Sequence, residues 1–592
     1  MRTGLPPRLM DSRRPGYLFE PARLIGTVVE VGPEHARVNL PLAAAQEPQM
    51  QHGERVGAGE VGEFVVVEAG DVGIFGRIRE VKLPERERLA VEARMGRDVD
   101  AHPIGRVQLL TTIPLAGGPP QTGIARFPRV GARVYSIEPA LVTWIADHAG
   151  ATDDESALRL DLAYLPGSTT TTVRITPERL FGRHCAVLGA TGGGKSWTLA
   201  RIVERCEEFD AKVILLDATG EYHGLSKRVR HVSIGDDVDR PEGTEQTVLP
   251  YRDLEELDLF ALLRPSIQSQ APKMRAAIKS LKLAEILGKD HELVDDGVIA
   301  KANRSKAPFD TAYATHAAQI EDAAAAFDIT KLARQIELEC VWPSGWGQAK
   351  GHKDHTLWGD QNEGDFSHCT TLIARLESYL AAEEFAPVFQ PEGQVSVLDV
   401  IEEFVASSDS VLRISLRHLS FKQDIREIVA NGIARRLLAL ARDGMFLKRP
   451  LAVCLDEAHQ FLNKSLGDEF TRYPLDAFEL IAKEGRKYSL SICIATQRPR
   501  DIPDAVLGQM GTLLVHRLTN DRDREIVERA AGDIDRSAAD FLPSLAPGQA
   551  VLLGIDFPIP LIIQVSPPTA PPDSSGPDFQ SHWRRRAEAA EE

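Results

Sequence analysis

The chain has 592 residues, which is too long for one ordinary domain and predicts about two to four. Its 43% hydrophobic and 26% charged content is ordinary for a soluble globular protein, and no run of about twenty apolar residues is present to span a membrane. The formal net charge of −17 argues against a protein coated all over with nucleic acid, but it does not exclude a narrow basic channel, because the local field matters more than the sum.

The six cysteines are scattered along the chain, and none forms a C-x-x-C pair. Neither a zinc ribbon nor a disulfide framework is therefore indicated. The first residues, Met1 to Pro7, lack the apolar core of a signal peptide. We expect a protein of the reducing cytoplasm.

The region from 20 to 150 consists of short β-rich segments separated by glycine and polar residues. This pattern predicts a small β-barrel, preceded by an N-terminal arm over 1–19 and followed by a linker over 151–175. No catalytic constellation is visible in it, so we interpret it as a structural and assembly module. The segments are 24–31, 36–40, 63–68, 73–78, 105–110 and 133–137.

From 176 onward, apolar strands alternate with helices, which predicts an α/β sheet. The first strand, 185–188, leads into Gly189–Ser196, which fits the pattern G-x-x-x-x-G-K-[ST]. Glycines let backbone N–H groups approach phosphate oxygens, where a Cβ would clash. Lys195 can reach the β- and γ-phosphates and Ser196 can hold Mg²⁺, so ATP and Mg²⁺ are the expected cofactors. The expected nucleotide-binding residues are Gly189, Ala190, Thr191, Gly192, Gly193, Gly194, Lys195, Ser196 and Trp197.

Helical patterns dominate 251–399, which we interpret as an insertion into an ATPase core formed by 176–250 and 400–566. A second core strand is expected at 212–217, a long helix at 422–442, and further strands at 451–455 and 490–495. The tail over 567–592 is rich in proline, serine and charge, which is typical of a flexible segment.

An acid pair, Asp456 and Glu457, directly follows the apolar strand 451–455. Asp456 is placed to order the metal ion, and Glu457 to activate the attacking water as general base. Gln497, at the end of the next strand, is a candidate sensor of the γ-phosphate, although a strand-end hydrogen-bonding residue is the alternative. Arg183 and Arg486 are candidates for stabilising the transferring phosphoryl group, and an ordinary surface arginine has equal weight for each.

Several segments in a fixed order resemble one known family. They are Arg183-His184 before the glycine loop, Asp217-Ala218-Thr219-Gly220-Glu221-Tyr222, Asp456-Glu457-Ala458-His459, Gly485-Arg486-Lys487-Tyr488 and Thr496-Gln497-Arg498-Pro499. The set, spread over about 20–565, is similar to the HerA family of hexameric DNA-translocating ATPases, relatives of the FtsK pumps. One departure is Ala218-Thr219, where the family often has Pro-His, so the role of those two positions stays open.

The resemblance implies a HAS-type barrel, a RecA-like core, a helical insertion and a homohexamer that moves double-stranded DNA through its pore. It also implies a partner, either a NurA-like nuclease in end resection and DNA repair or, in some bacterial relatives, a sirtuin-like or other effector subunit in phage defence. By position, Arg183 corresponds to the cis-acting arginine of the family and Arg486 to its trans-acting finger.

Two functions outside translocation remain as hypotheses: a ring-shaped ATPase scaffold that activates an effector enzyme, and an ATPase acting on proteins. For translocation, DNA has to be held by its phosphates. The candidate contacts are Arg264, Lys273 and Arg275, or Arg413, Arg417 and Lys422, although a solvated surface charge is the commoner explanation for any one of them.

Overall fold

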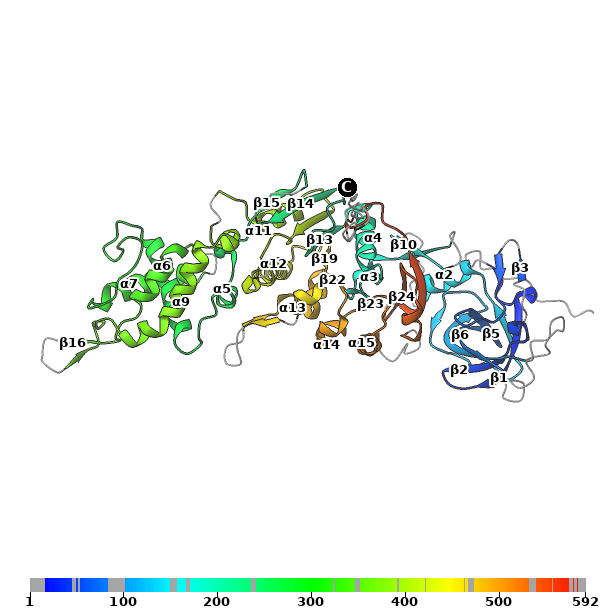
Figure 1. Ribbon diagram of the computed structural model, residues 1–592. Helices are drawn as coiled ribbons and strands as arrows, with labels where there is room; N and C mark the ends of the chain where they lie inside the picture. Colours follow the sequence, from blue (N-terminus) through cyan, green and yellow to red (C-terminus); the bar gives the residue numbers. More distant parts are fainter. Residues whose placement is uncertain are drawn as a thin grey trace, which may run out of the picture. The chain divides into compact units, whose positions relative to one another are not determined.

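The computed structural model describes residues 16–44, 49–51, 54–83, 102–149, 157–166, 171–235, 241–322, 325–346, 352–390, 393–420, 422–462, 464–466, 473–531, 539–555, 557–573, 579 and 583 (Figure 1). The predicted N-terminal arm and C-terminal tail lie mostly outside these residues. The chain divides into two compact units. Unit 1 comprises Met1–Arg205, Thr496–Arg500 and Leu507–Pro567, and unit 2 comprises Cys206–Ala495, Asp501–Val506 and Pro568–Glu592.

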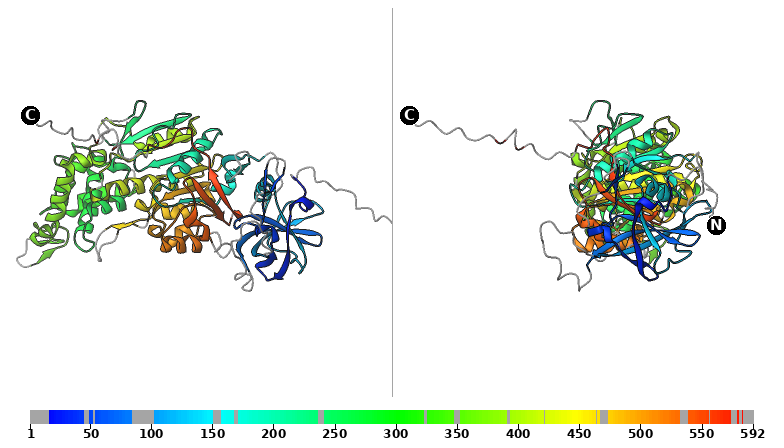
Figure 2. Two further views of the ribbon diagram at one scale, coloured as in Figure 1. Left: turned by 45° about the vertical axis from the view of Figure 1, so that its right-hand side comes forward. Right: turned by 90° about the vertical axis from the view of Figure 1, so that its right-hand side faces the viewer.

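Unit 1 begins with a closed antiparallel barrel, as the sequence predicts. Its strands are β1 (Leu24–Val31), β2 (His35–Asn39), β5 (Phe64–Ala69), β6 (Val72–Lys82), β7 (Ile104–Pro114) and β9 (Arg133–Ser136), with β8 (Gln121–Thr122) added at β7 and a separate hairpin of β3 (Gln49–Gln51) and β4 (Glu54–Val56). The sheet order β2-β1-β9-β5-β6-β7 closes through pairing of β2 with β7. Two further views show the blue strands curving around one another (Figure 2).

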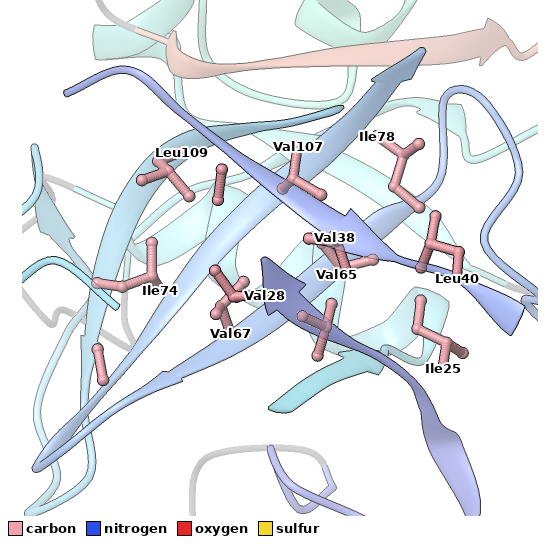
Figure 3. Close-up of a cluster of buried hydrophobic side chains, with 13 residues drawn as sticks. Ile25, Val28, Val38, Leu40, Val65, Val67, Ile74, Ile78, Val107 and Leu109 are labelled. Atoms are coloured by element: carbon pink, nitrogen blue, oxygen red, sulfur yellow. The ribbon is translucent and has the colours of Figure 1, made fainter. Parts of the chain in front are cut away.

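The barrel is filled by aliphatic side chains that point toward one another from every strand (Figure 3). Val38, Val65 and Val107 are completely buried. Gly26 and Gly76 lie where the strand register shifts, and a Cβ there would sit 2.0 and 2.5 Å from a carbonyl oxygen of the neighbouring strand. Glycine at these two positions allows the strands to bend tightly enough to close the barrel.

The rest of unit 1 is a strand layer with helices. Its elements are α2 (Pro139–His148), β10 (Leu160–Tyr164), β11 (Thr172–Ile175), α3 (Pro177–Phe181), β12 (Cys185–Leu188), α4 (Lys195–Glu207), β23 (Thr512–His516), α15 (Asp521–Ala531), η10 (Ala539–Ser544), β24 (Gln549–Gly554) and β25 (Phe557–Val565). Of the short helix α14 (Asp504–Leu507), only Leu507 belongs to unit 1. The order is β11-β10-β25-β24-β23-β12. β10 and β11 lie in the stretch predicted as a linker, and β10 pairs with β25. The sequence does not reveal these two strands, because each is only a few residues long and carries no distinct apolar run.

Unit 2 contains a parallel sheet, which confirms the predicted α/β core. Its order is β22 (Leu490–Thr496), β19 (Leu451–Leu455), β13 (Lys212–Asp217), β18 (Val411–Ser415), β14 (Val229–Ile234) and β15 (Glu245–Thr247). Every residue of β13, β18 and β19 is buried, as expected for strands covered on both faces. The flanking helices are α12 (Ile425–Arg442) and α13 (Ala477–Glu484), with a hairpin of β20 (Lys464–Leu466) and β21 (Tyr473–Leu475).

The predicted long helix starts three residues later than expected. Gln423 and Asp424 both have φ of 56°, so α12 begins only at Ile425. A left-handed backbone cannot continue an α-helix, and the sequence pattern gives no sign of this conformation.

Helices make up most of the predicted insertion, seen in green in Figure 1. They are α5 (Glu256–Leu263), α6 (Gln270–Leu287), α7 (Lys306–Ile320), α8 (Leu332–Leu338), α9 (Glu363–Ala381), α10 (Ala386–Phe389) and α11 (Val397–Ala406), with a small hairpin of β16 (Gly345–Trp346) and β17 (Lys353–Asp354). Among the described residues, no helix combines the length and the apolar character needed to cross a bilayer.

Candidate nucleotide site

The predicted phosphate-binding loop lies in unit 1 between β12 and α4. β12 is buried at all four residues, and α4 begins at Lys195. Gly192 and Gly194 have φ of 75° and 110°, a backbone conformation that other residues rarely adopt. Strand, glycine loop and helix thus occur in the order that a phosphate-binding loop requires.

The side chains of the loop are held by internal hydrogen bonds. Lys195 is 8% exposed, and its Nζ donates to the carbonyl oxygen of Ala190 at 3.1 Å. Thr191 Oγ1 donates to Gln497 Oε1 at 2.5 Å, so the expected γ-phosphate sensor lies beside the loop. Because a phosphate oxygen is a stronger acceptor for an ammonium group than a carbonyl, this cradle fits a nucleotide phosphate.

The predicted acid pair lies in unit 2, where Asp456 directly follows the buried strand β19. Asp456 is 5% exposed, and Thr219 Oγ1 donates to its Oδ2 across 3.5 Å. Burial raises the pKa of Asp456 well above its usual range, and the charges of Asp217, Glu457 and Glu221 raise it further. A carboxyl group crowded by other acids is stabilised by a cation, so this residue set fits a divalent metal ion with oxygen ligands.

Glu457 has an unusual backbone and an unsatisfied carboxylate. Its φ of 47° and ψ of 45° are left-handed, which a non-glycine residue adopts at a cost. Among the described residues, Oε2 has no hydrogen-bond partner, although it is buried. His459 Nδ1 lies 3.2 Å from this Oε2. The two groups form an ion pair when the imidazole ring is protonated. Glu457 Oε2 is thus a buried carboxylate oxygen with a titratable imidazole beside it.

Asp217 organises the turn next to these acids. It is fully buried and accepts the backbone N–H groups of Gly220 at 2.7 Å, Glu221 at 3.2 Å and Tyr222 at 3.1 Å. Arg413 Nε donates to Asp217 Oδ2 at 2.7 Å. The family-like segment 217–222 is thus a turn closed by its own first residue.

Arg413 corrects one expectation from the sequence. It is a candidate DNA contact by charge alone, but its side chain is 2% exposed and pairs with Asp217. It lies on β18, a strand that the sequence analysis does not identify, and so its direction into the sheet could not be foreseen. A second donor of the same residue, NH2, reaches the carbonyl oxygen of Gly220 at 3.2 Å.

Most of the other basic candidates form ion pairs. The pairs are Arg264 with Asp424, Lys273 with Asp365, Arg275 with Glu256, and Lys422 with Glu384. Arg417 is exposed, and within the described part of the chain it has no ion pair. The two candidate catalytic arginines differ: Arg183 is half-buried before β12, whereas Arg486 is exposed in η8 (Gly485–Tyr488). Trp197 is 43% exposed on α4.

The family model "Helicase HerA, central domain" matches residues 160–325. The chain is 23% identical over 415 residues to the DNA double-strand break repair helicase HerA of Saccharolobus solfataricus, covering 69% of each chain. It is 22% identical over 422 residues to the same-named protein of Sulfolobus acidocaldarius, covering 70% of each. The resemblance to the HerA family is confirmed.

With its phosphate-binding loop, the HerA-like chain is an ATP-hydrolysing enzyme of the P-loop class. Among solved structures, a bacterial conjugative coupling protein, TrwBdeltaN70, is similar with a TM-score of 0.41 and 14% identity, covering 73% of this chain and 92% of that chain. A likeness of this size is too slight to bear on function.

Proposed function

We propose that this chain is an ATP-driven translocase and helicase for double-stranded DNA, which forms a homohexameric ring in the cytoplasm and feeds DNA to a partner nuclease in end resection. The observation that carries the proposal is that a phosphate-binding loop and the strand-end acid pair Asp456-Glu457 occur together in a chain similar to the helicase HerA. The names of the relatives, which specify double-strand break repair, support DNA as the substrate. A NurA-like nuclease is the partner that this resemblance suggests.

In this proposal, the backbone of Gly189–Ser196 and the ammonium group of Lys195 bind the phosphates of ATP. Ser196 and Asp456 hold Mg²⁺, which when bound offsets the negative charge of the phosphates. Glu457 takes the proton from the attacking water as general base. Gln497 responds to the γ-phosphate through the contact it shares with Thr191.

Arg183 and Arg486 stabilise the charge that develops on the transferring phosphoryl group. The exposure of Arg486 suits a residue that acts on a neighbouring copy, and the half-buried Arg183 suits one that acts within its own copy. The barrel over 20–150, the insertion over 251–399 and the tail from 567 serve assembly and DNA handling in this proposal. The exposed Arg417 is the basic candidate that is best placed to contact DNA phosphates.

The test is the ATPase rate with and without linear duplex DNA, with Lys195→Ala as the control for contaminating activity. We expect duplex DNA to raise the rate of the wild-type protein and to leave the variant inactive. A rate that does not respond to DNA, or a protein that stays monomeric with nucleotide in ultracentrifugation, would contradict the proposal. The scaffold alternative predicts instead that Glu457→Gln abolishes hydrolysis and still activates the effector.

A further inference from the structure

A buried histidine lies against the inner side of the phosphate-binding loop. His516 is the last residue of β23 and is completely buried. The loop glycines face it closely: a Cβ at Gly189 would sit 2.6 Å from His516 Cβ, and one at Gly194 would sit 3.3 Å from His516 Cε1. The lack of side chains at these positions therefore makes room for the histidine as well as for phosphates.

The hydrogen bonds of the ring fix its tautomer. Nδ1 lies 2.8 Å from the carbonyl oxygen of Gln549, and because a carbonyl can only accept, Nδ1 must carry the proton. In the neutral ring Nε2 is then an acceptor, and Thr198 Oγ1 at 2.8 Å donates to it. His516 thus links the first residue of β24 to the first turn of α4.

The ring stays neutral for a physical reason. Burial lowers the pKa of His516 to about 4, and the nearby charge of Lys195 lowers it as well. The only other ring contact of hydrogen-bonding type in the described residues is the Gln549 carbonyl, which partly opposes this shift. At neutral pH, Nε2 therefore remains available to accept the hydroxyl hydrogen of Thr198.

Two backbone contacts hold the same loop from the same side. The N–H of Ala190 donates to the carbonyl oxygen of Arg517 at 3.0 Å, and the N–H of Gly548 donates to the carbonyl oxygen of Gly193 at 3.3 Å. The end of β23 and the turn before β24 therefore support the loop, and the bond of His516 to Thr198 extends this support to α4, the helix that carries Lys195.

We propose that His516 is a positioning residue for nucleotide binding, which acts through Thr198 to hold the first turn of α4, with Lys195 and Ser196, in the orientation that phosphates require. The inference rests on the ATP-binding part of the proposed function and not on DNA. Its ligand is the β- and γ-phosphate portion of a nucleotide, because that is the portion that Lys195 reaches.

The test uses two pairs of variants on the full chain. Thr198→Val removes the hydroxyl with little change of shape, and Thr198→Ser restores it. His516→Asn can still donate to Gln549 but cannot reach Thr198, whereas the longer His516→Gln can place an acceptor near it. Val551→Ala, a buried truncation on β24, is the control for a general loss of stability.

The dissociation constants of MgADP and AMP are measured at pH 7.5 without DNA, together with thermal unfolding. We expect Thr198→Val and His516→Asn to weaken MgADP binding by about fivefold to tenfold, the effect of one buried hydrogen bond, and to leave AMP binding unchanged. The Ser and Gln variants should recover most of the affinity. The double variant Thr198→Val/His516→Asn should be no weaker than either single variant, because both remove the same bond.

Equal MgADP affinity in all variants, with only lower unfolding temperatures like that of Val551→Ala, would overturn the inference and leave the proposed function intact. Additive effects in the double variant would also overturn it. A wild-type protein that binds no MgADP would instead reject the ATP-binding function itself, and the inference with it.

Discussion

The phosphate-binding loop in unit 1 and the acid group in unit 2 are stabilised in opposite ways. In the phosphate-binding loop and the first turn of α4, the side chains of Thr191, Lys195 and Thr198 are hydrogen-bonded to their surroundings within unit 1. In the acid group, Asp456 is crowded by other carboxylates, and among the described residues the buried Oε2 of Glu457 makes no hydrogen bond, with His459 Nδ1 3.2 Å away. The polar groups of the loop are therefore paired, whereas Asp456 is destabilised by its acidic neighbours, as a cation-binding group would be before its ion arrives. In the proposed function, these acids are where charge changes during hydrolysis.

The largest expected effect is on the acid side of this comparison. Glu457→Gln keeps the shape but removes the proposed general base, so we expect kcat for ATP to fall by about 10²- to 10⁴-fold. Nucleotide affinity should stay within about threefold, since the loop is untouched. Steady-state ATPase assays and MgADP titrations measure the two quantities.

Glu479→Gln is the matched control, because Glu479 lies in the same unit and pairs at the surface with Lys483. It should hydrolyse ATP at the wild-type rate. A Glu457→Gln protein with more than a tenth of the wild-type kcat would show that another residue activates the water.

The second effect concerns Arg413, which pairs with the buried Asp217 of the acid group. Arg413→Met leaves Asp217 charged and buried, so we expect the free energy of unfolding to fall by about 3–5 kcal/mol. Urea unfolding followed by circular dichroism measures it. Arg436→Met provides the contrast, because the pair of Arg436 with Glu402 is 41% and 45% exposed and should contribute less than about 1 kcal/mol.

If Arg413→Met and Arg436→Met lower the free energy of unfolding equally, burial does not explain how much the Asp217–Arg413 pair stabilises the fold. The comparison between the compensated loop and the uncompensated acids would then lose its physical basis.

The third effect is a pH dependence of stability that arises from His516, on the loop side of the comparison. The pKa of His516 is lowered to about 4 in the folded protein, from about 6.5 in an unfolded chain. Between these values the unfolded state binds a proton that the native state refuses. The free energy of unfolding is therefore unaffected by His516 above about pH 6.5. It falls as pH is lowered toward 4, by up to about 3 kcal/mol from this group.

Urea midpoints measured at pH 7.5, 6.0 and 5.0 for the wild type and His516→Gln isolate this contribution, because the variant has no titrating ring. The wild type should lose more stability on acidification than the variant does. Parallel curves for the two proteins would mean that His516 keeps an ordinary pKa.

The sequence predicts the barrel, the phosphate-binding loop and the strand before the acid pair, since each has a strong local pattern. The glycines of the loop and the five apolar residues before Asp456 are adjacent in the chain, so periodicity and composition suffice. The roles of Arg183, Gln497 and Arg486 stay predictions, because they depend on a bound nucleotide or a second copy.

The sequence does not predict the partners that come from distant strands. Arg413 meets Asp217, and His516 meets Thr198, across 196 and 318 positions of the chain. β18 is a five-residue strand, Val411–Ser415, with Arg413 at its centre. A charged residue in the middle of so short a segment does not predict a buried strand unless its partner, Asp217, is known. Long-range pairing of polar residues is set by the fold and leaves no local pattern.

The smallest expected effect tests whether pairing alone, without burial, has any weight in the loop-bearing unit. Arg79 of the barrel strand β6 donates from NH2 to Asp540 of η10, but the Asp540 side chain is 72% exposed. A solvated ion pair gains little over its hydrated partners, so Arg79→Ala and Asp540→Ala should each cost less than about 1 kcal/mol, with a coupling energy of about 0.5 kcal/mol or below. The neighbouring Arg77 is 4% exposed and its guanidinium lies 4.2 Å from the centre of the Phe541 ring, so Phe541→Ala should cost more stability than Arg79→Ala or Asp540→Ala.

Chemical unfolding of the two single variants, the double variant and Phe541→Ala compares these costs directly. A coupling energy above about 2 kcal/mol for the exposed pair would mean that hydrogen-bonded charges stabilise this unit without being buried, and the internal bonds of the phosphate-binding loop could then no longer be distinguished from surface pairs by their burial.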